Sequence, residues 1–322
     1  MSGEPGRPPL RAATFFATIA VMEETFAPGD LLPREEVRAL SRRADGPALA
    51  MLASKILGLA ASGYLIFLAR GTWWLLPAML VHGIQVVFLF PGLHECVHMT
   101  PFRTRWLNTG VGWVLSLLTF YPWVYFRHFH FTHHRHAQDP ARDPELLGVD
   151  LSTRLKFLLW VSALPYWKRR LWGSLKHALT GRVTQPFIEP RFRPAIVREA
   201  RIVWAVYLGI AVVAALIDPW APVLYWLLPA ALAQPLLRLY LNGEHGGVAQ
   251  AGDSFATART TLTHPAIRWL AWNMPYHTEH HLYPNVPFHA LPRLHARVRG
   301  RLHNVGNGYV AVNRGLWAAL RV

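Results

Sequence analysis

The sequence has a single cysteine, Cys96, and few charged residues for its length. One thiol excludes a disulfide framework, a rubredoxin-type iron site and an iron–sulfur cluster held by this chain alone. Charged residues make up 16% of the 322 residues, whereas an average soluble protein has about 25%. Hydrophobic residues make up 52%, and fourteen are tryptophans. This composition excludes a disordered chain and indicates that lipid surrounds much of the surface.

Acidic residues are particularly scarce, with 18 Asp and Glu against 33 Lys and Arg, so the formal net charge is +15. The basic residues lie between the apolar runs, as expected where positive segments stay on the cytosolic side of a membrane. We therefore expect no nucleic acid partner. A positive cytosolic face instead suits anionic lipid headgroups or an acidic protein.

Four apolar runs are long enough to cross about 30 Å of hydrocarbon as helices that rise about 1.5 Å per residue. They span about residues 48–69, 73–93, 202–217 and 220–240. Short connections join the first two and the last two runs, which predicts two helical hairpins. A fifth run, 106–125, is interrupted by Gly110, Gly112 and Pro122. Because histidine clusters flank it on both sides, we expect a re-entrant or interfacial segment there.

These runs predict an all-α polytopic membrane protein with four transmembrane helices in two hairpins. A cytosolic helical cap would carry the histidine clusters, and both termini would be cytosolic. We divide the chain into a cytosolic N-terminal tail, residues 1–47, and a membrane domain, residues 48–322. The active site of such an integral membrane protein would face the cytoplasm, because the basic segments lie on that side.

The spacing of the histidines carries the functional information. Eight of the seventeen fall into three groups: His94 and His98; His130, His133 and His134; His277, His280 and His281. On a helix, residues four apart lie about 40° from each other, and each triplet covers an arc of about 100°. Three such groups can direct eight imidazoles at one volume. His82 lies about 18 Å deeper along its helix, so we interpret it as a satisfied polar residue or part of a tunnel wall.

The motifs are HECVH at 94–98, HFTHH at 130–134 and YHTEHH at 276–281. Together they resemble the membrane-bound fatty acid desaturase and hydroxylase superfamily of non-haem diiron enzymes. The resemblance covers roughly residues 50–300 and includes the segment after the third motif. It implies that the eight histidines are ligands of two iron ions, with O2 as co-substrate.

A ninth ligand is implied by the same resemblance. The sequence NGEHG at 242–246 is similar to an element of membrane alkane hydroxylases near the end of the last membrane helix. We therefore carry His245 over as a ligand. In several relatives an asparagine that holds water lies four residues before this histidine, whereas Asn242 lies three before it.

Polar side chains near the motifs can orient the imidazoles by bonding their outer ring nitrogens. The candidates are Glu95, Asp139, Asp143, Asn242, Glu244 and Glu279. Asp139 and Asp143 each precede a proline, so helix capping in a turn is an equally good interpretation of these two residues.

The resemblance implies an O2-dependent oxidoreductase acting on a lipid. Desaturation of a fatty-acyl chain is favoured by its prevalence in the family. Hydroxylation of an alkane, lipid or carotenoid and formation of a terminal alkene remain alternatives on the same scaffold. The chain has no flavin motif, so electrons would come from a separate ferredoxin, rubredoxin or cytochrome b5 type donor that docks on the basic cytosolic face.

Two other classes of protein stay open. HECVH also fits HExxH, the zinc motif of metalloproteases, in which two histidines bind zinc and the glutamate is the base. An intramembrane zinc protease would leave most of the clustered histidines without a role. A metal transporter is a third hypothesis, but it would need ionisable residues within the crossings, which have few of them.

Overall fold

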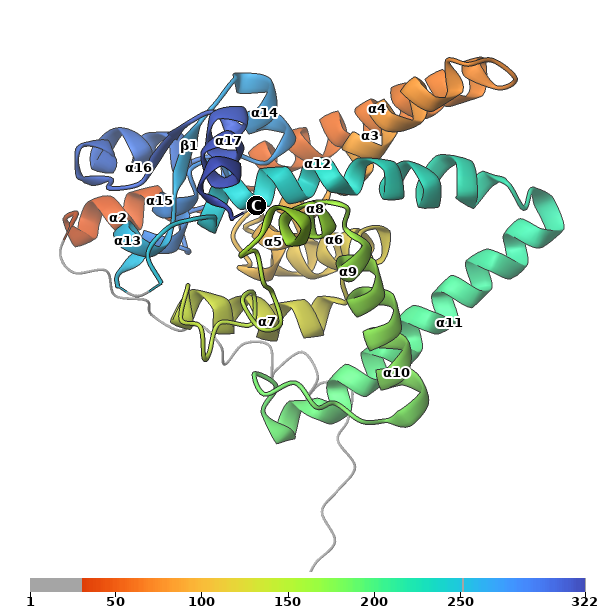
Figure 1. Ribbon diagram of the computed structural model, residues 1–322, viewed down its shortest axis with the longest axis horizontal. Coiled ribbons are helices and arrows are strands. Elements are labelled where there is room, and N and C mark those ends of the chain that lie inside the picture. Colours follow the sequence, from red (N-terminus) through yellow and green to blue (C-terminus); the bar gives the residue numbers. More distant parts are fainter. Residues whose placement is uncertain (1–30, 251, 322) are drawn as a thin grey trace, which may run out of the picture.

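The computed structural model describes residues 31–250 and 252–321 (Figure 1). Most of the first 47 residues, predicted to be a tail, therefore lie outside the described residues. The first helices are α2 (Arg34–Leu40), α3 (Asp45–Ala69), α4 (Leu75–Val87), α5 (Phe90–Val97), α6 (Arg105–Leu118), α7 (Trp123–His136), α8 (Arg154–Val161), α9 (Leu164–Trp167), η2 (Lys168–Trp172) and α10 (Gly173–Thr180). The later ones are η3 (Pro190–Phe192), α11 (Arg193–Ile217), η4 (Val223–Leu227), α12 (Leu228–His245), α13 (Ser254–Thr257), α14 (Pro265–Leu270), α15 (His277–Leu282), α16 (Leu291–Val298), η5 (Arg299–Arg301) and α17 (Tyr309–Ala319).

Within these ranges the chain is mostly helical, as predicted. A short parallel pair of strands, β1 (Thr260–Leu262) and β2 (Val305–Asn307), was not predicted. Strands of three residues carry too little alternation to be recognised from sequence. Their pairing places the segment after α12 beside the segment before α17.

Three helices are long and apolar enough to cross a membrane: Asp45–Ala69, Leu75–Val97 and Pro190–Ile217. They contain most of the predicted crossings 48–69, 73–93 and 202–217. The third begins earlier than its apolar run, because η3 and the first turns of α11 precede it. The predicted crossing 220–240 corresponds to η4 and α12 and is not among the three. Gln234 and Arg238 interrupt its apolar character.

The first predicted hairpin is a packed pair, and α12 packs against it as a third helix (Figure 1). Gly83 on α4 makes this close approach possible. A Cβ atom at Gly83 would lie 2.0 Å from the carbonyl oxygen of Pro229 at the start of α12. Lys55 on α3 is 1% exposed and donates to the carbonyl oxygens of Trp269 (3.1 Å) and Leu270 (2.9 Å), so it ties α3 to the end of α14.

The second predicted hairpin is not a packed pair. Helices α11 and α12 are joined by residues 218–222 and η4 but diverge from there, as Figure 1 shows. The carboxyl end of α6 lies between them: its Leu117 and Leu118 carbonyls accept hydrogen bonds from Tyr207 (2.9 Å) and Trp226 (2.8 Å). These two side chains point inward from α11 and η4, and their partners keep the helices apart.

The run 106–125 becomes α6 followed by a turn and the first residues of α7. With 14 residues, α6 is about 21 Å long, which is short of the about 30 Å of a hydrocarbon core. Gly112 faces the next helix, where a Cβ atom would lie 2.0 Å from the ring of Trp123. This close approach sets the angle at which α7 leaves α6.

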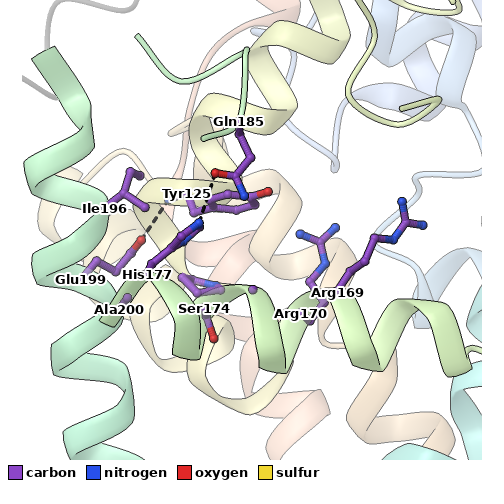
Figure 2. Close-up of a pocket in the computed structure, with 11 residues that line it drawn as sticks. Tyr125, Arg169, Arg170, Ser174, His177, Gln185, Ile196, Glu199 and Ala200 are labelled. Atoms are coloured by element: carbon purple, nitrogen blue, oxygen red, sulfur yellow. Dashed lines mark hydrogen bonds between the residues drawn. The ribbon is translucent and has the colours of Figure 1, made fainter. Parts of the chain in front are cut away.

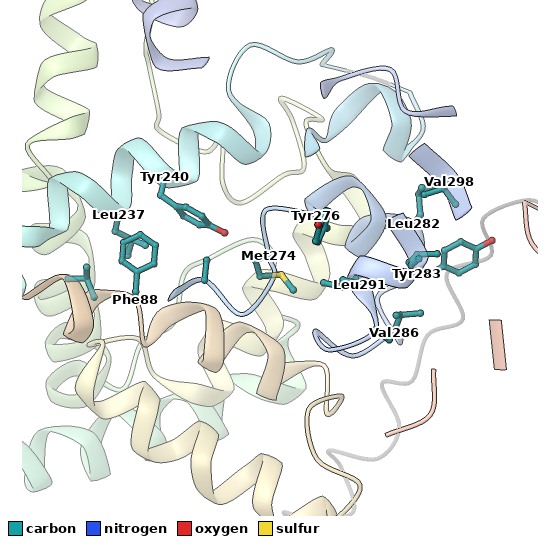
Figure 3. Close-up of a cluster of buried hydrophobic side chains, with 14 of the residues drawn as sticks. Phe88, Leu237, Tyr240, Met274, Tyr276, Leu282, Tyr283, Val286, Leu291 and Val298 are labelled. Carbon is teal, nitrogen blue, oxygen red and sulfur yellow. The ribbon is translucent and has the colours of Figure 1, made fainter. Parts of the chain in front are cut away.

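The largest buried cluster joins the membrane helices to the carboxyl-terminal part of the chain (Figure 3). Phe88 and Leu237 enter it from α4 and α12, whereas Leu282 and Leu291 enter from α15 and α16. Met274 lies between them with 1% exposure. The cluster therefore fixes the short helix α15 against the end of α12.

Candidate metal centre

Four helices bring the nine candidate histidines together. His94 lies in the last turn of α5, and His98 directly follows that helix. Helix α7 carries the second triplet, His245 is the last residue of α12, and the third triplet begins α15. All nine side chains are buried.

The nine histidines form two separate groups. Members of one group have ring nitrogens within 4.8 Å of one another: His94, His98, His130, His134 and His280. The other group meets the same criterion: His133, His245, His277 and His281. Each of the two triplets therefore contributes to both groups, so α7 and α15 lie across the centre and connect its halves.

Close contacts between Nε2 atoms run through both groups. In the five-histidine group they measure 2.7 Å for His98 and His130, 2.9 Å for His130 and His134, and 3.1 Å for His134 and His280. In the four-histidine group they measure 3.1 Å for His133 and His245, and 2.8 Å for His245 and His277. Ring nitrogens converge in this way when their lone pairs share a cation.

The contacts of two Nδ1 atoms show which ring nitrogens of His133 and His245 carry protons. Nδ1 of His133 lies 3.0 Å from both carboxylate oxygens of Asp143, and Nδ1 of His245 lies 2.8 Å from the carbonyl oxygen of Thr257. Both Nδ1 atoms therefore donate, so Nε2 of each ring keeps its lone pair in the neutral, metal-binding form. These lone pairs face each other across 3.1 Å. A positive ion beside them makes this arrangement favourable.

His94 gives a second indication that the centre binds a metal ion. Both of its ring nitrogens are buried and have no hydrogen-bond partner among the described residues. Its ring centroid lies 4.2 Å from that of His130 and 4.6 Å from that of His280. A buried imidazole without a partner is costly, and a metal ion in this position would satisfy it.

Burial keeps most of these imidazoles neutral. Desolvation lowers the pKa of His130, His280 and His281 well below the usual range, and lowers that of His245 to about 3. The neutral form is the one that binds metals. The donor set therefore fits a soft-to-intermediate metal such as iron, zinc or copper better than magnesium or calcium.

His133 differs from the others because carboxylates surround it. Burial lowers its pKa, but the carboxylates of Glu145 and Asp143 outweigh burial and raise the pKa to about 9. Nδ1 of His133 lies 3.9 Å from Glu145, and Nδ1 of His277 lies 3.6 Å from Glu244. This half of the centre favours a positive charge, which is a proton or, in its place, a metal ion.

Two predicted orienting residues, Glu95 and Glu279, bond elsewhere. Glu95 accepts hydrogen bonds from Thr100 (3.0 Å) and from the backbone N–H of Phe288 (3.0 Å). Glu279 contacts Thr260 and the ring of His295. Both carboxyl groups therefore hold in place the helices that carry the histidines, and neither contacts a ring nitrogen of the nine candidate histidines.

Asp139 and Asn242 also have other partners. Asp139 accepts from the N–H of Ala141 and pairs with Arg142 at 2.6 Å, so it closes a turn. Asn242 bonds the side chains of Asn313 (3.0 Å) and Trp160 (3.2 Å). Asp139 therefore closes a turn in which no helix begins, whereas Asp143 contacts a histidine and also accepts backbone N–H groups of the same loop.

Sequence reasoning missed Glu199, which fixes the start of α7. Its buried carboxyl group on α11 accepts hydrogen bonds from the backbone N–H groups of Val124 (2.5 Å) and Tyr125 (3.0 Å). Figure 2 draws the hydrogen bond with Tyr125. Glu199 lies before the predicted crossing 202–217, between Arg198 and Arg201, so the sequence around it gave no distinct signal.

The geometry agrees with comparisons to known proteins. A family model described as fatty acid desaturase matches residues 71–313. The chain belongs to this family. All nine histidines lie within the matched residues of this desaturase-family chain.

Curated relatives of this desaturase-family chain are about one quarter identical to it. The chain is 26% identical over 234 residues to the sphingolipid delta(4)-desaturase DES1 of Drosophila melanogaster. The matched region covers 69% of this chain and 65% of that protein. It is 27% identical over 248 residues to the sphingolipid delta(4)-desaturase/C4-monooxygenase DES2 of Homo sapiens, with coverages of 70% and 67%. It is 29% identical over 258 residues to a beta-carotene ketolase of a Paracoccus species, with coverages of 74% and 90%.

Proposed function

We propose that the chain is a membrane oxidoreductase that binds two iron ions through the nine histidines and oxidises a C–H bond of a lipid with O2. The observation that carries this proposal is the division of the histidines into groups of five and four, each within 4.8 Å. Family membership and the names of the relatives support the same class of reaction.

The donor set favours two metal ions over one. A catalytic zinc site uses three protein ligands and an open position, so a protease would leave at least six of these histidines unused. His94 and His98 also lie with His130 and His280, rather than forming a separate pair. The glutamate that would be the protease base is Glu95, and its carboxylate is held by Thr100 and the N–H of Phe288.

Iron with O2 supplies an oxidant strong enough to remove hydrogen from an unactivated C–H bond. The residues of the chain hold and orient the imidazoles and keep water away. Asp143 and the Thr257 carbonyl fix the rings of His133 and His245 so that Nε2 points inward. Burial of all nine side chains excludes bulk water from the centre.

The finer assignment is a desaturase acting on a fatty-acyl or other lipid chain, with a hydroxylase as the alternative. Relatives named as a desaturase/C4-monooxygenase and as a ketolase support a shared scaffold for both outcomes. We further propose that the membrane domain, residues 48–322, crosses four times with the centre facing the cytoplasm. A separate ferredoxin, rubredoxin or cytochrome b5 type protein would deliver electrons to the basic face there.

Metal analysis of the purified protein tests the proposal. We expect about two irons per chain, held by imidazole as in other non-haem sites. His133→Ala and His280→Ala each change a different group and should lower the iron content, whereas His303→Ala removes an exposed histidine and should not. One zinc per chain that is lost in His94→Ala and kept in His280→Ala would contradict the proposal and favour the protease. With iron present, lipid products formed with an added electron donor would distinguish an alkene from an alcohol.

A further inference from the structure

Arg238 on α12 is a buried cation without an acidic partner. Its side chain is 8% exposed, and its guanidinium lies 4.4 Å from the ring centre of Tyr166 and 5.1 Å from that of Trp160. Its Nε has no hydrogen-bond partner in the part of the chain that the structure describes. Arginines are almost never buried without a paired group, so an unpaired one indicates a missing anion.

A second arginine lies against the same aromatic ring. The guanidinium of Arg170 on η2 is 5.6 Å from the ring centre of Tyr166 and 3.3 Å above the ring of Tyr121. It donates to the hydroxyl of Tyr121 and pairs with no carboxylate among residues 31–250 and 252–321. Figure 2 shows Arg170 extending from η2 beside Arg169. Two cations that share one ring repel each other unless an anion joins them.

Glu145 is the internal acid that has to be considered. It acts electrostatically on both Arg170 and Arg238, but no ion pair forms with either. Its carboxylate lies instead 3.9 Å from His133, and its side chain is 39% exposed. Glu145 therefore does not satisfy the guanidinium groups by direct contact.

Gln234 adds a neutral donor one helical turn from Arg238. The two residues are four apart on α12 and so lie on one face. Gln234 is 3% exposed, and its Nε2 has no hydrogen-bond partner among the described residues. It lines a cavity of about 10 Å³ together with Tyr166 and Leu237. Apart from Thr119, Tyr166, Trp167 and Gln234 the lining is apolar, and the Gln234 amide can donate to an oxygen atom placed there.

Apolar space continues from this cavity in two directions. Phe90 lines it and lies one turn, about 6 Å, before His94 on α5. Leu118 lines it and also lines a groove of about 590 Å³ beside α11, whose other walls include Ile210, Val213 and Trp226. The cavity is narrow, so a chain passing through it has to separate the stacked rings of Phe120 and Trp226.

We propose that Arg238 and Arg170 bind the anionic headgroup of a long-chain substrate. The apolar chain of this substrate would extend past Gln234 to Phe90, on the side of the cavity that leads to His94. A carboxylate and a phosphate monoester share the required chemistry, namely anionic oxygens that accept from guanidinium groups. The proposal rests on the proposed function, because it names the substrate class of that centre.

Binding to the metal-free full-length protein in lipid nanodiscs tests the headgroup separately from catalysis. The probes are hexadecanoate, hexadecyl phosphate and hexadecanol, which have the same chain and different headgroups. We expect at least one anionic probe to bind about tenfold or more tighter than hexadecanol, as for one charge-assisted hydrogen bond. The tighter of the two anions identifies the headgroup. Equal binding of all three probes would overturn the proposal.

Variants separate a ligand role from a structural one. Arg238→Met should remove the preference for the anion, leave hexadecanol binding unchanged and not lower the melting temperature, because an unpaired buried charge is removed. Arg238→Lys should keep part of the preference. Arg314→Met removes an exposed arginine of α17 whose side chain has no hydrogen bond or ion pair among the described residues, and it should change none of these values. If Glu145 is the true partner, Arg238→Met and Glu145→Gln will both lower the melting temperature and the preference will persist, which refutes the proposal.

The proposed function can fail independently. Iron content and lipid oxidation test the metal centre, whereas probe binding needs no metal. Two irons without any headgroup preference would reject only the headgroup site, and a headgroup preference without iron would reject only the diiron centre.

Discussion

Asp143→Asn provides a sharp test of how the chain holds one metal ion. The carboxylate of Asp143 is fully buried and lies 3.0 Å from Nδ1 of His133. It also accepts the backbone N–H groups of Gln138 (2.8 Å) and Glu145 (2.9 Å). Asparagine has nearly the same shape but no charge, and it retains only one acceptor oxygen. The substitution therefore alters the electrostatics of His133 with little change in packing.

The expected magnitude follows from these contacts. Replacement of a carboxylate that bonds a ligating histidine typically lowers metal affinity about 10- to 100-fold, or about 1.4–2.8 kcal/mol. The amide nitrogen must also face one of the donors that the lost oxygen served, which costs about 1 kcal/mol in loop stability. Only the four-histidine group contains His133, so one ion should weaken and the other should not.

The assay is a competition titration in which the protein and a chelator share a limiting amount of Fe²⁺, with bound metal counted by mass spectrometry. The matched control is Asp139→Asn in the same loop, since Asp139 is partly exposed and bonds Arg142 and the N–H of Ala141. We expect the control to bind Fe²⁺ with the affinities of the wild-type protein. In Asp143→Asn, only one of the two Fe²⁺ binding steps should become weaker. Two unchanged steps in Asp143→Asn, or equal losses in both variants, would refute the reasoning.

Three further substitutions test the supports of the centre. Glu199→Ala should lower the free energy of unfolding by about 3 kcal/mol, because the backbone N–H groups of Val124 and Tyr125 lose their acceptor. Glu189→Ala, at an exposed position, should have little effect in the same denaturation assay. Lys55→Met should lower the free energy of unfolding by about 2 kcal/mol, because the carbonyl groups of Trp269 and Leu270 lose their donor. It should also speed amide hydrogen exchange in residues 268–276 around these two carbonyls. Gly83→Ala should separate α4 from α12 and reduce bound iron, whereas Gly209→Ala, which meets open space, should be neutral or stabilise slightly in a melting experiment.

The parts of the centre that follow helical periodicity could be predicted from the sequence. Spacings of three and four residues within one helix brought His130 and His134 to one group, and the adjacent His133 to the other. The division into five and four could not be predicted, because it depends on how α7 and α15 cross. That angle follows from contacts between distant residues, such as Glu95 with the N–H of Phe288, 193 residues later.

The membrane helices show the same limit. Length and hydropathy identified three helices that the structure confirms as candidates for crossing. They did not reveal that α11 and α12 diverge, because that depends on Tyr207 and Trp226 reaching carbonyl groups at the end of α6. Hydropathy measures the average free energy of transfer of a segment to lipid. It contains no information on which polar atoms find hydrogen-bond partners in the fold.

Partners also divide the buried polar residues of these helices into two classes. Lys55 is satisfied by two carbonyl oxygens, Glu199 by two N–H groups, and His82 by Ser62 (2.8 Å) and the Tyr225 carbonyl (2.9 Å). Removal of any of them leaves a buried group unpaired, so their variants should lose stability. Arg238 and Gln234 have donors without partners, and replacing them with apolar residues should not weaken the ligand-free fold. A sequence that keeps buried donors without hydrogen-bond partners is locally inconsistent in the manner expected of a binding site.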